Sequence, residues 1–238
     1  MKKAIVVGAS SGIGLELARV LAAHQYKVGI TGRRTQLLED LQKEAPTSYL
    51  VQTLDNTDLA AIPASLGSLA AALGGVDLLI ISSGTGFVNK PFDFEPELTT
   101  IDTNVRGFAA IANWAFRLFE QQGYGHLVGI SSVAGMRGSR LAPAYNASKA
   151  FQINLLEGLR QKANKIKAPI FVSDIRPGFV ATDMAKGDGL FWVSSPEKAA
   201  RQIFKAINRK KRYAYVTKRW VTLAVLLKII PGFIYERL

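Results

Sequence analysis

The chain has 238 residues, of which 48% are hydrophobic and 20% charged, a composition typical of one globular domain rather than two. It has no cysteine, which excludes disulfide bonds and thiolate metal sites, and its only imidazoles are His24 and His126, so we expect no metal centre. The formal net charge of +12 is uneven, because ten Lys or Arg residues and one acidic residue follow position 200. The charge therefore indicates something about that segment's surroundings and little about the fold.

Apolar, β-branched runs alternate with helical patterns along the chain. The start, MKKAIVVGAS, briefly resembles a signal sequence, but Glu16 and Arg19 follow so soon that we expect a strand. The expected strands are 3–9, 26–32, 48–54, 76–82, 125–131 and 169–175, and the expected helices are 12–24, 35–45, 58–73, 97–122, 143–165 and 195–208. This alternation predicts an α/β fold, a doubly wound, Rossmann-like parallel sheet with helices on both faces, in one domain over residues 1–238.

A glycine-rich turn joins the first expected strand to the first expected helix. The stretch VVGASSGIGLELA places Gly8, Gly12 and Gly14 where backbone amides and a helix dipole can face a pyrophosphate. The spacing is GxxxGxG and not the GxGxxG of the dinucleotide fingerprint, and a tight turn without a ligand would use the same glycines. The position at the first strand–helix junction favours a dinucleotide cofactor.

The end of the second strand bears on which nicotinamide cofactor is used. An NAD site usually has a carboxylate there for the ribose 2′-hydroxyl, whereas this chain has Arg33 and Arg34. A guanidinium suits a 2′-phosphate, so we predict NADP(H) in preference to NAD(H), with a pair of solvated arginines as the alternative. Asp55, after the third strand, either accepts from the adenine amino group or caps the next helix.

The stretch YNASK places a phenol and an ammonium four residues apart, on one face of a helix that Pro143 would start. An ammonium stabilises phenolate, so we expect the pKa of Tyr145 to fall from ~10 to near 7, which requires about 4 kcal/mol from Lys149 and a cationic nicotinamide. Ser132 follows the fifth strand, at the sheet edge where open α/β sheets bind ligands. Taken alone, YxxxK fits an ordinary helix equally well.

Together with Asn104 in DTNVRG and the RPG at 176–178, these motifs occur in the order seen in the short-chain dehydrogenase/reductase family, which the chain resembles over about residues 3–207. The resemblance implies that Tyr145 is the general acid/base and that Ser132 orients the substrate. Lys149 would bind the nicotinamide ribose, and Asn104 would lie at a helix distortion and hold a water of the proton relay.

The resemblance also implies the residues of the cofactor site. They are Gly8, Ser10, Ser11, Gly12, Ile13, Gly14, Arg33, Arg34, Asp55, Gly84, Tyr145, Lys149, Pro177, Gly178, Val180 and Thr182. Two departures from the family pattern predict altered detail with binding retained: Ser82 and Ser83 replace Asn and Ala, and Val7 replaces Thr.

The substrate side is predicted to be apolar. The resemblance places a substrate lid between the PG turn and the last helix, with Gly187 and Gly189 as candidate hinges. The residues expected to cover or line the substrate are Phe87, Met136, Phe179, Phe191 and Trp192, although core packing would account for any one of them. We predict NADP(H)-dependent hydride transfer to or from an apolar ketone, aldehyde or secondary alcohol, while Arg137 and Arg140 offer an anionic substrate as the alternative.

The C-terminal tail, residues 209–238, is basic and apolar. Its segment WVTLAVLL is flanked by lysine and arginine, as in helices that lie on anionic membranes, but a buried helix is also apolar all round. We expect packing on the core or on a second subunit, with membrane contact through 213–238 as the alternative and nucleic-acid binding not expected. A cytoplasmic homo-oligomer, dimer or tetramer, is expected, and a catalytically silent NADPH sensor or scaffold is the competing function.

Overall fold

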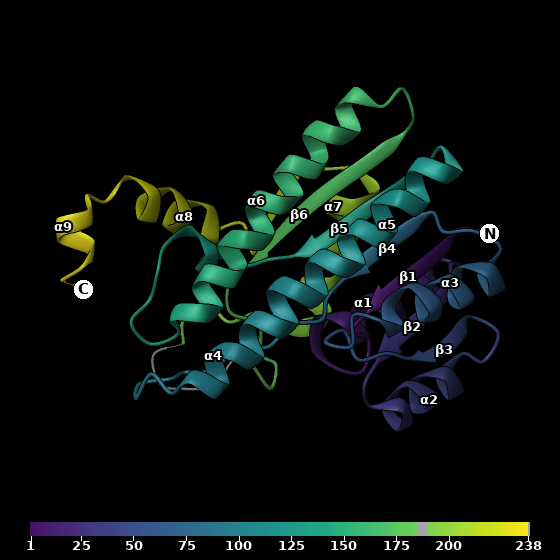
Figure 1. Cartoon of the computed structure of the whole chain (residues 1–238), viewed down its shortest axis with the longest axis horizontal. Coiled ribbons are helices and arrows are strands. Elements are labelled where there is room, and N and C mark those ends of the chain that lie inside the picture. The colour runs from purple at the N-terminus through teal and green to yellow at the C-terminus, as the bar shows by residue number, and fades with distance from the viewer. Residues whose placement is uncertain (185–189, 238) are drawn as a thin grey trace.

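The computed structural model describes residues 1–184 and 190–237, and in these the strands form a seven-stranded, fully parallel sheet in the order β3-β2-β1-β4-β5-β6-β7 (Figure 1). The strands are β1 (Lys3–Val7), β2 (Lys27–Gly32), β3 (Tyr49–Thr53), β4 (Leu78–Ile81), β5 (Gly125–Ile130), β6 (Ile170–Pro177) and β7 (Tyr213–Val216). The order reverses beside β1, so the predicted doubly wound sheet is confirmed, and its switch point lies between β1 and β4.

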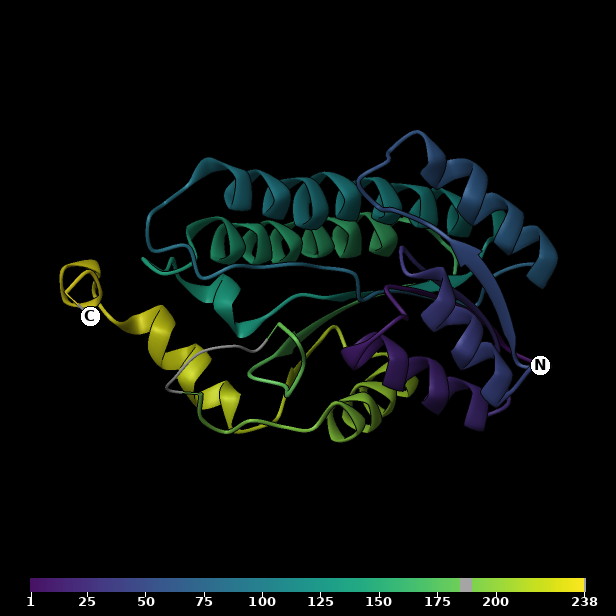
Figure 2. The same cartoon turned by 90° about the horizontal axis from the view of Figure 1, so that it is seen from below.

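Helices cover both faces of the sheet. They are α1 (Gly12–Ala23), α2 (Thr35–Glu44), α3 (Ala61–Leu73), α4 (Phe94–Ile101), α5 (Phe108–Gln122), α6 (Pro143–Lys165), α7 (Pro196–Asn208), α8 (Trp220–Ile229) and α9 (Gly232–Tyr235). Figure 2 shows α5 and α6 above the sheet and α1, α2 and α7 below it. Because each strand is apolar on both sides, it contributes alternate residues to two cores, as Val6 and Ile5 of β1 illustrate.

The expected helix over 97–122 is interrupted. A π-helix, η1 (Asp102–Gly107), separates α4 from α5 and contains the fully buried Asn104. A π-turn re-aims a helix and often lies at a functional site, so this segment brings Asn104 toward the loop after β4.

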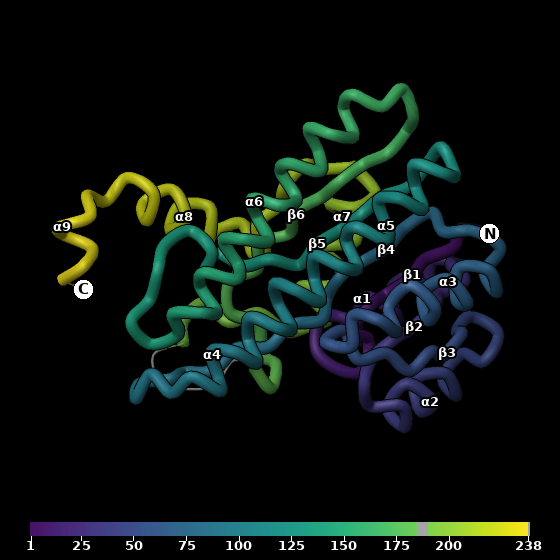
Figure 3. Tube along the Cα trace, in the orientation of Figure 1, coloured from purple at the N-terminus to yellow at the C-terminus, as the bar shows by residue number. Residues whose placement is uncertain are grey.

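The tail packs on the core in part, as expected, and also forms a strand that the sequence did not predict. Its first part pairs with β6 as the unexpected strand β7, while α8 and α9 extend from the body on the side away from the N-terminus (Figures 1 and 3). Helix α8 packs inward through Trp220 and Ala224, and leaves Val225 and Ile229 exposed. Among the described residues, no helix is both long and apolar enough to cross a bilayer. The candidate hinges Gly187 and Gly189 lie outside the described residues.

Candidate active site

The turn between β1 and α1 has a backbone that requires glycine. Gly8 and Gly12 have φ of +87° and +58°, in the left-handed region. A Cβ on Gly8 would lie 2.6 Å from the amide nitrogen of Ser83, and a Cβ on Gly14 would collide with the carbonyl oxygen of Gly8. Helix α1 then starts without a side-chain cap from Ser11, so its first amides are available to an acceptor. An uncapped helix N-terminus behind a close-packed glycine turn fits the pyrophosphate of a dinucleotide.

Two arginines follow β2, and Arg34 is the one that contacts this turn. Its Nη2 donates to the hydroxyls of Ser10 at 3.0 Å and Ser11 at 2.6 Å. Arg33 is exposed beside it. A guanidinium thus lies against the first positions of the glycine-rich turn, where it adds positive charge to the helix N-terminus.

Asp55 lies beyond β3 in a local turn. Its carboxylate accepts from the backbone N–H and the hydroxyl of Thr57, at 3.0 and 2.8 Å. Helix α3 begins further along, at Ala61, with Ala60 in the N-cap position. The expectation that Asp55 caps this helix is therefore wrong, since its carboxylate stabilises the turn before it.

Two hydroxyls meet at the carboxyl end of β5. Ser132 caps the short 3₁₀ helix η2 (Val133–Met136), with its Oγ 3.1 Å from the amide of Ala134. The Ser132 side chain lies near enough to the Tyr145 phenol to affect its pKa. The Tyr145 ring packs flat against Gly86, where any Cβ would overlap the ring. The glycine after β4 thus makes room for the phenol beside the serine.

The pKa of Tyr145 shifts in the direction opposite to the one expected. Burial raises the pKa of this phenol, and the nearby Ser132 hydroxyl lowers it to a smaller extent. The Lys149 ammonium lies 5.7 Å from the centre of the Tyr145 ring, and it donates to the carbonyl oxygen of Ile130 at 3.1 Å. The expected acidification of Tyr145 by Lys149 is therefore wrong for the protein alone.

Lys149 is itself buried, with 5% of its surface exposed. Burial lowers the pKa of its ammonium to about 8, and the negative charge of Asp174 acts in the opposite direction. Its second acceptor is Oε1 of Gln152, at 3.0 Å. An ammonium held in this way is close to losing its proton near neutral pH.

Asn104 fixes the loop that follows β4. Its Nδ2 donates to the carbonyl of Thr85 at 2.7 Å and to the hydroxyl of Ser148 at 3.0 Å, while its Oδ1 accepts from the amide of Thr85 at 2.9 Å. In the same loop Gly84 lies between Asn104 and Lys149, with its Cβ position 3.6 Å from the ammonium. Ser83, where the family has alanine, accepts a hydrogen bond from Asn56 at 3.3 Å.

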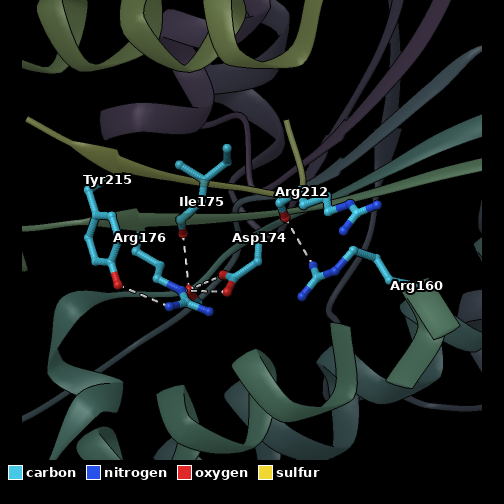
Figure 4. Close-up of polar contacts among 7 residues, drawn as sticks. Arg160, Asp174, Ile175, Arg176, Arg212 and Tyr215 are labelled. Carbon is cyan, nitrogen blue, oxygen red and sulfur yellow. Dashed lines mark hydrogen bonds and ion pairs between the residues drawn. The ribbon is translucent and has the colours of Figure 1, made fainter. Parts of the chain in front are cut away.

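The arginine of the RPG motif, Arg176, forms polar contacts within the sheet. Arg176 donates through Nε to Asp174 at 2.6 Å and through Nη1 to the hydroxyl of Tyr215 at 3.1 Å (Figure 4). Asp174 also accepts from the hydroxyl of Ser131. The ion pair lies within β6, and the hydrogen bond from Arg176 to Tyr215 links β6 to β7.

The segment after β6 faces the glycine-rich turn and the tail. Thr182 lies against Gly12, with its Cγ2 3.0 Å from the Cβ position of that glycine. Val180 is buried and bridges to Ser194. Gly178 packs so closely on the Trp220 indole that a Cβ would overlap it. The tail therefore touches the turn that Pro177 and Gly178 form.

Aromatic side chains pack around the turn that Pro177 and Gly178 form. Phe191 stacks on Trp220 with ring centres 5.2 Å apart, and Phe179 meets Trp220 edge-on at 5.3 Å. Phe191 and Trp192 are nearly half exposed, as are Phe87 and Met184. Arg137 is engaged by the tail, because it donates to the carbonyl of Ile230 at 3.2 Å and lies 4.4 Å from the Tyr235 ring centre. The exposed surface around this turn is mostly apolar.

Several residues of this network were not identified from the sequence. Gln152, Thr85 and Asp174 belong to it without being part of any motif, and Ser148 lies within YNASK without having been assigned a role. Spacing alone could have found Gln152, because it follows Lys149 by one helical turn and so shares its face of α6.

Comparisons with known proteins identify the class. A sequence model of the short chain dehydrogenase family matches residues 2–189, and the chain belongs to this family of oxidoreductases, whose fold binds a nicotinamide cofactor. It is 32% identical to an uncharacterized oxidoreductase of Mycobacterium tuberculosis, over 99% of this chain and 96% of that protein.

Solved structures show the same architecture. A serine dehydrogenase complexed with NADP+ is 27% identical, with a TM-score of 0.79 over 86% of this chain and 88% of that one. A short chain dehydrogenase/reductase from Burkholderia phymatum in complex with NAD is 20% identical, with a TM-score of 0.85 over 94% and 92%, a likeness of fold alone.

Proposed function

We propose that the protein is an NADP(H)-dependent oxidoreductase that reduces an apolar ketone or aldehyde, or oxidises the corresponding secondary alcohol. The observation that carries this proposal is the proximity of the hydroxyls of Ser132 and Tyr145 at the carboxyl end of β5, with the Lys149 ammonium 5.7 Å from the centre of the Tyr145 ring. The apolar edge formed by Phe191, Trp192 and Phe87 supports a substrate with little charge.

The nicotinamide would supply or accept the hydride, and the chain's own residues would handle the oxygen and its proton. Ser132 donates a hydrogen bond to the carbonyl oxygen and holds it next to the phenol. Tyr145 then gives its proton to that oxygen as negative charge develops there. Because burial raises the pKa of Tyr145, the phenol keeps its proton at neutral pH, which favours the reductive direction.

The preference for NADP(H) rests on the arginines after β2. Arg34 lies on Ser10 and Ser11 at the glycine-rich turn, and its planar guanidinium can form paired hydrogen bonds to a phosphate. Glu39 is the first carboxylate after β2, and it lies on the exposed side of α2. We propose Arg34 as the principal 2′-phosphate ligand, with Arg33 beside it.

The test combines cofactor titration with turnover of a panel of apolar carbonyls. Tyr145→Phe is expected to bind NADPH within about threefold of the wild type and to lose roughly 10²–10⁴ in kcat, the usual contribution of a general acid. Tyr124→Phe, at the opposite edge of the sheet, is the matched control and should leave kcat unchanged. Wild-type turnover by Tyr145→Phe would refute the assignment. NADPH binding without turnover of any carbonyl would instead support the silent sensor.

A second candidate function follows from the tail: we propose that the enzyme docks on an anionic membrane surface. Six exposed apolar side chains lie on α8 and α9, with exposed fractions of 42–69%. They are Val221, Val225, Leu226, Ile229, Phe233 and Ile234. Residues 221, 225 and 229 follow the i, i+4 spacing of one helix face.

The positive charge around this apolar face favours an anionic partner. Lys218, Arg219, Lys228 and Arg237 accompany the apolar residues, with Glu236 as the acid among them. A second copy would bring the same positive charge against it, whereas anionic headgroups complement it and the apolar side chains insert between them. Helices α8 and α9, which carry this face, lie on the side of the molecule away from the N-terminus (Figure 1).

Vesicle co-sedimentation tests this second candidate. The full chain should bind vesicles that contain anionic lipid and not neutral vesicles, and Val225→Glu with Ile229→Glu should abolish binding. Leu37→Glu, which places the same change at an exposed apolar position of α2, should bind as the wild type does. Equal binding by all variants, or loss of a dimer in place of vesicle binding, would refute the membrane partner.

A further inference from the structure

Gln152 is a buried amide at the centre of the site, with no exposed surface. Its Oε1 accepts from the Lys149 ammonium at 3.0 Å, and its Nε2 donates to the backbone carbonyl of Asn104 at 2.9 Å. The ammonium also donates to the carbonyl of Ile130 at 3.1 Å. A single side chain thus joins Lys149 on α6 to the π-helix that carries Asn104.

The two neighbours of Gln152 dictate its chemistry. An ammonium only donates hydrogen bonds and a backbone carbonyl only accepts them, so the residue between them must accept on one side and donate on the other. A carboxamide does both without adding charge. A carboxylate would serve Lys149 alone, and an apolar side chain would serve neither, so this position has a specific chemical requirement.

Lys149 depends on such an acceptor because it is buried. Hydrogen bonding to the charged form opposes the desolvation that lowers the pKa of Lys149 to about 8. In the part of the chain that the structure describes, two other ionisable groups act on it: Tyr145 on its own helix, and Asp174 on β6, whose carboxylate is already paired with Arg176 at 2.6 Å. The neutral Gln152 contributes the nearest acceptor from a side chain.

We propose that Gln152 is a positioning residue. Its carboxamide accepts from the Lys149 ammonium, which favours the charged form, and it donates to the carbonyl of Asn104, which holds the carboxamide in place. Its role in turnover rests on the proposed function, since it acts through Lys149. The family resemblance implies that Asn104 holds a relay water, and in this chain the backbone carbonyl of Asn104 accepts a hydrogen bond from Gln152. The polar link from Asn104 to Lys149 is therefore made by the protein itself.

Two substitutions with opposite expected effects test this role. Gln152→Met keeps the volume and removes both hydrogen bonds, so the pKa of Lys149 should fall by about one unit. Gln152→Glu places a carboxylate at the ammonium, so the same pKa should rise by about one unit or more. Gln122→Met is the control, because Gln122 bridges the backbone of Val76 at the opposite edge of the sheet.

The pKa of Lys149 is read directly from lysine labelled with 13C at Cε, by NMR titration of the cofactor-free protein, with Lys149→Arg for assignment. The alkaline limb of kcat/KM for a reducible carbonyl should move the same way in each variant. An unchanged Lys149 pKa in the folded Gln152→Met and Gln152→Glu proteins would overturn the proposal. If one variant fails to fold, an unchanged Lys149 pKa in the other variant is sufficient to overturn it. The expected NMR shifts without turnover by the wild type would support the positioning role and refute the proposed function instead.

Discussion

The two ends of strand β5 resemble each other electrostatically and differ in what surrounds them. At the amino end, His126 hydrogen-bonds the hydroxyl of Ser173 at 2.8 Å, and burial lowers the pKa of His126 to about 4. At the carboxyl end, the carbonyl of Ile130 accepts from Lys149, and burial lowers the pKa of Lys149 to about 8. Both ends therefore bury a basic group whose charged form is disfavoured.

The difference lies in how the neighbours are used. The Ser173 hydroxyl donates onward to the carbonyl of Lys211 at 2.5 Å, so the amino end is a closed hydrogen-bonded pair under a loop. The carboxyl end brings Lys149 together with two hydroxyls, a glycine-rich turn and an uncapped helix N-terminus. A shifted pKa thus reflects burial alone at the amino end and a candidate site at the carboxyl end. What distinguishes the carboxyl end is that several different functional groups lie close together there.

The largest expected difference between the two ends of β5 is in activity, when the serine at each end is replaced by alanine. Ser132→Ala should lower kcat/KM by about 10²-fold, because one hydrogen bond to the substrate oxygen is lost where charge develops. Ser173→Ala should leave kcat/KM unchanged. Steady-state kinetics with NADPH and a carbonyl from the panel measure both. Similar losses in the two variants would mean that the ends of β5 do not differ in function.

The second prediction concerns stability in acid. His126 is buried with its pKa lowered to about 4, so between pH 6.5 and 4 the unfolded chain takes up a proton that the native protein refuses. Stability from this group is present above pH 6.5 and is lost as pH falls through that window, by about 3 kcal/mol. Urea unfolding at pH 7 and pH 4 should show a smaller loss for His126→Gln than for the wild type. The exposed His24→Gln is the control, and an unchanged pH dependence in both variants would contradict the prediction.

The smallest expected effect distinguishes the two arginines after β2. Arg34→Gln should weaken NADPH binding by about tenfold, since it removes a charge-assisted contact to a phosphate, and should change NADH binding little. Arg33→Gln should have the weaker effect, because Arg34 is the one that lies on Ser10 and Ser11. Fluorescence titration of both cofactors measures the two effects, and a larger loss for Arg33→Gln would contradict the assignment of Arg34 as the principal ligand.

Much of the fold could be predicted because its signals are local. Strands that are apolar on both faces, such as Lys3–Val7 and Leu78–Ile81, are recognisable by composition, and the glycines at 8, 12 and 14 mark the turn after the first of them. The spacing of Tyr145 and Lys149 placed both on one face of α6. These features depend on neighbouring residues in the chain.

The rest depends on packing between distant segments. Strand β7 is only four residues long and follows a basic run, so its pairing with β6 has no local pattern. The direction of the Tyr145 pKa shift depends on how deeply the ring is buried against Gly86, which spacing does not reveal. The importance of Gln152 arises from a carbonyl on another helix, 48 residues earlier in the chain.

The contact between Trp220 and Gly178 has a thermodynamic consequence. Gly178 belongs to the turn proposed to contact the cofactor, and Trp220 opens the helix proposed to meet the membrane. Because an indole fills the space above that glycine, a shift of either element changes the packing of the other. Linkage then requires reciprocity: whatever factor the lipid surface applies to nucleotide affinity, the nucleotide applies to lipid affinity.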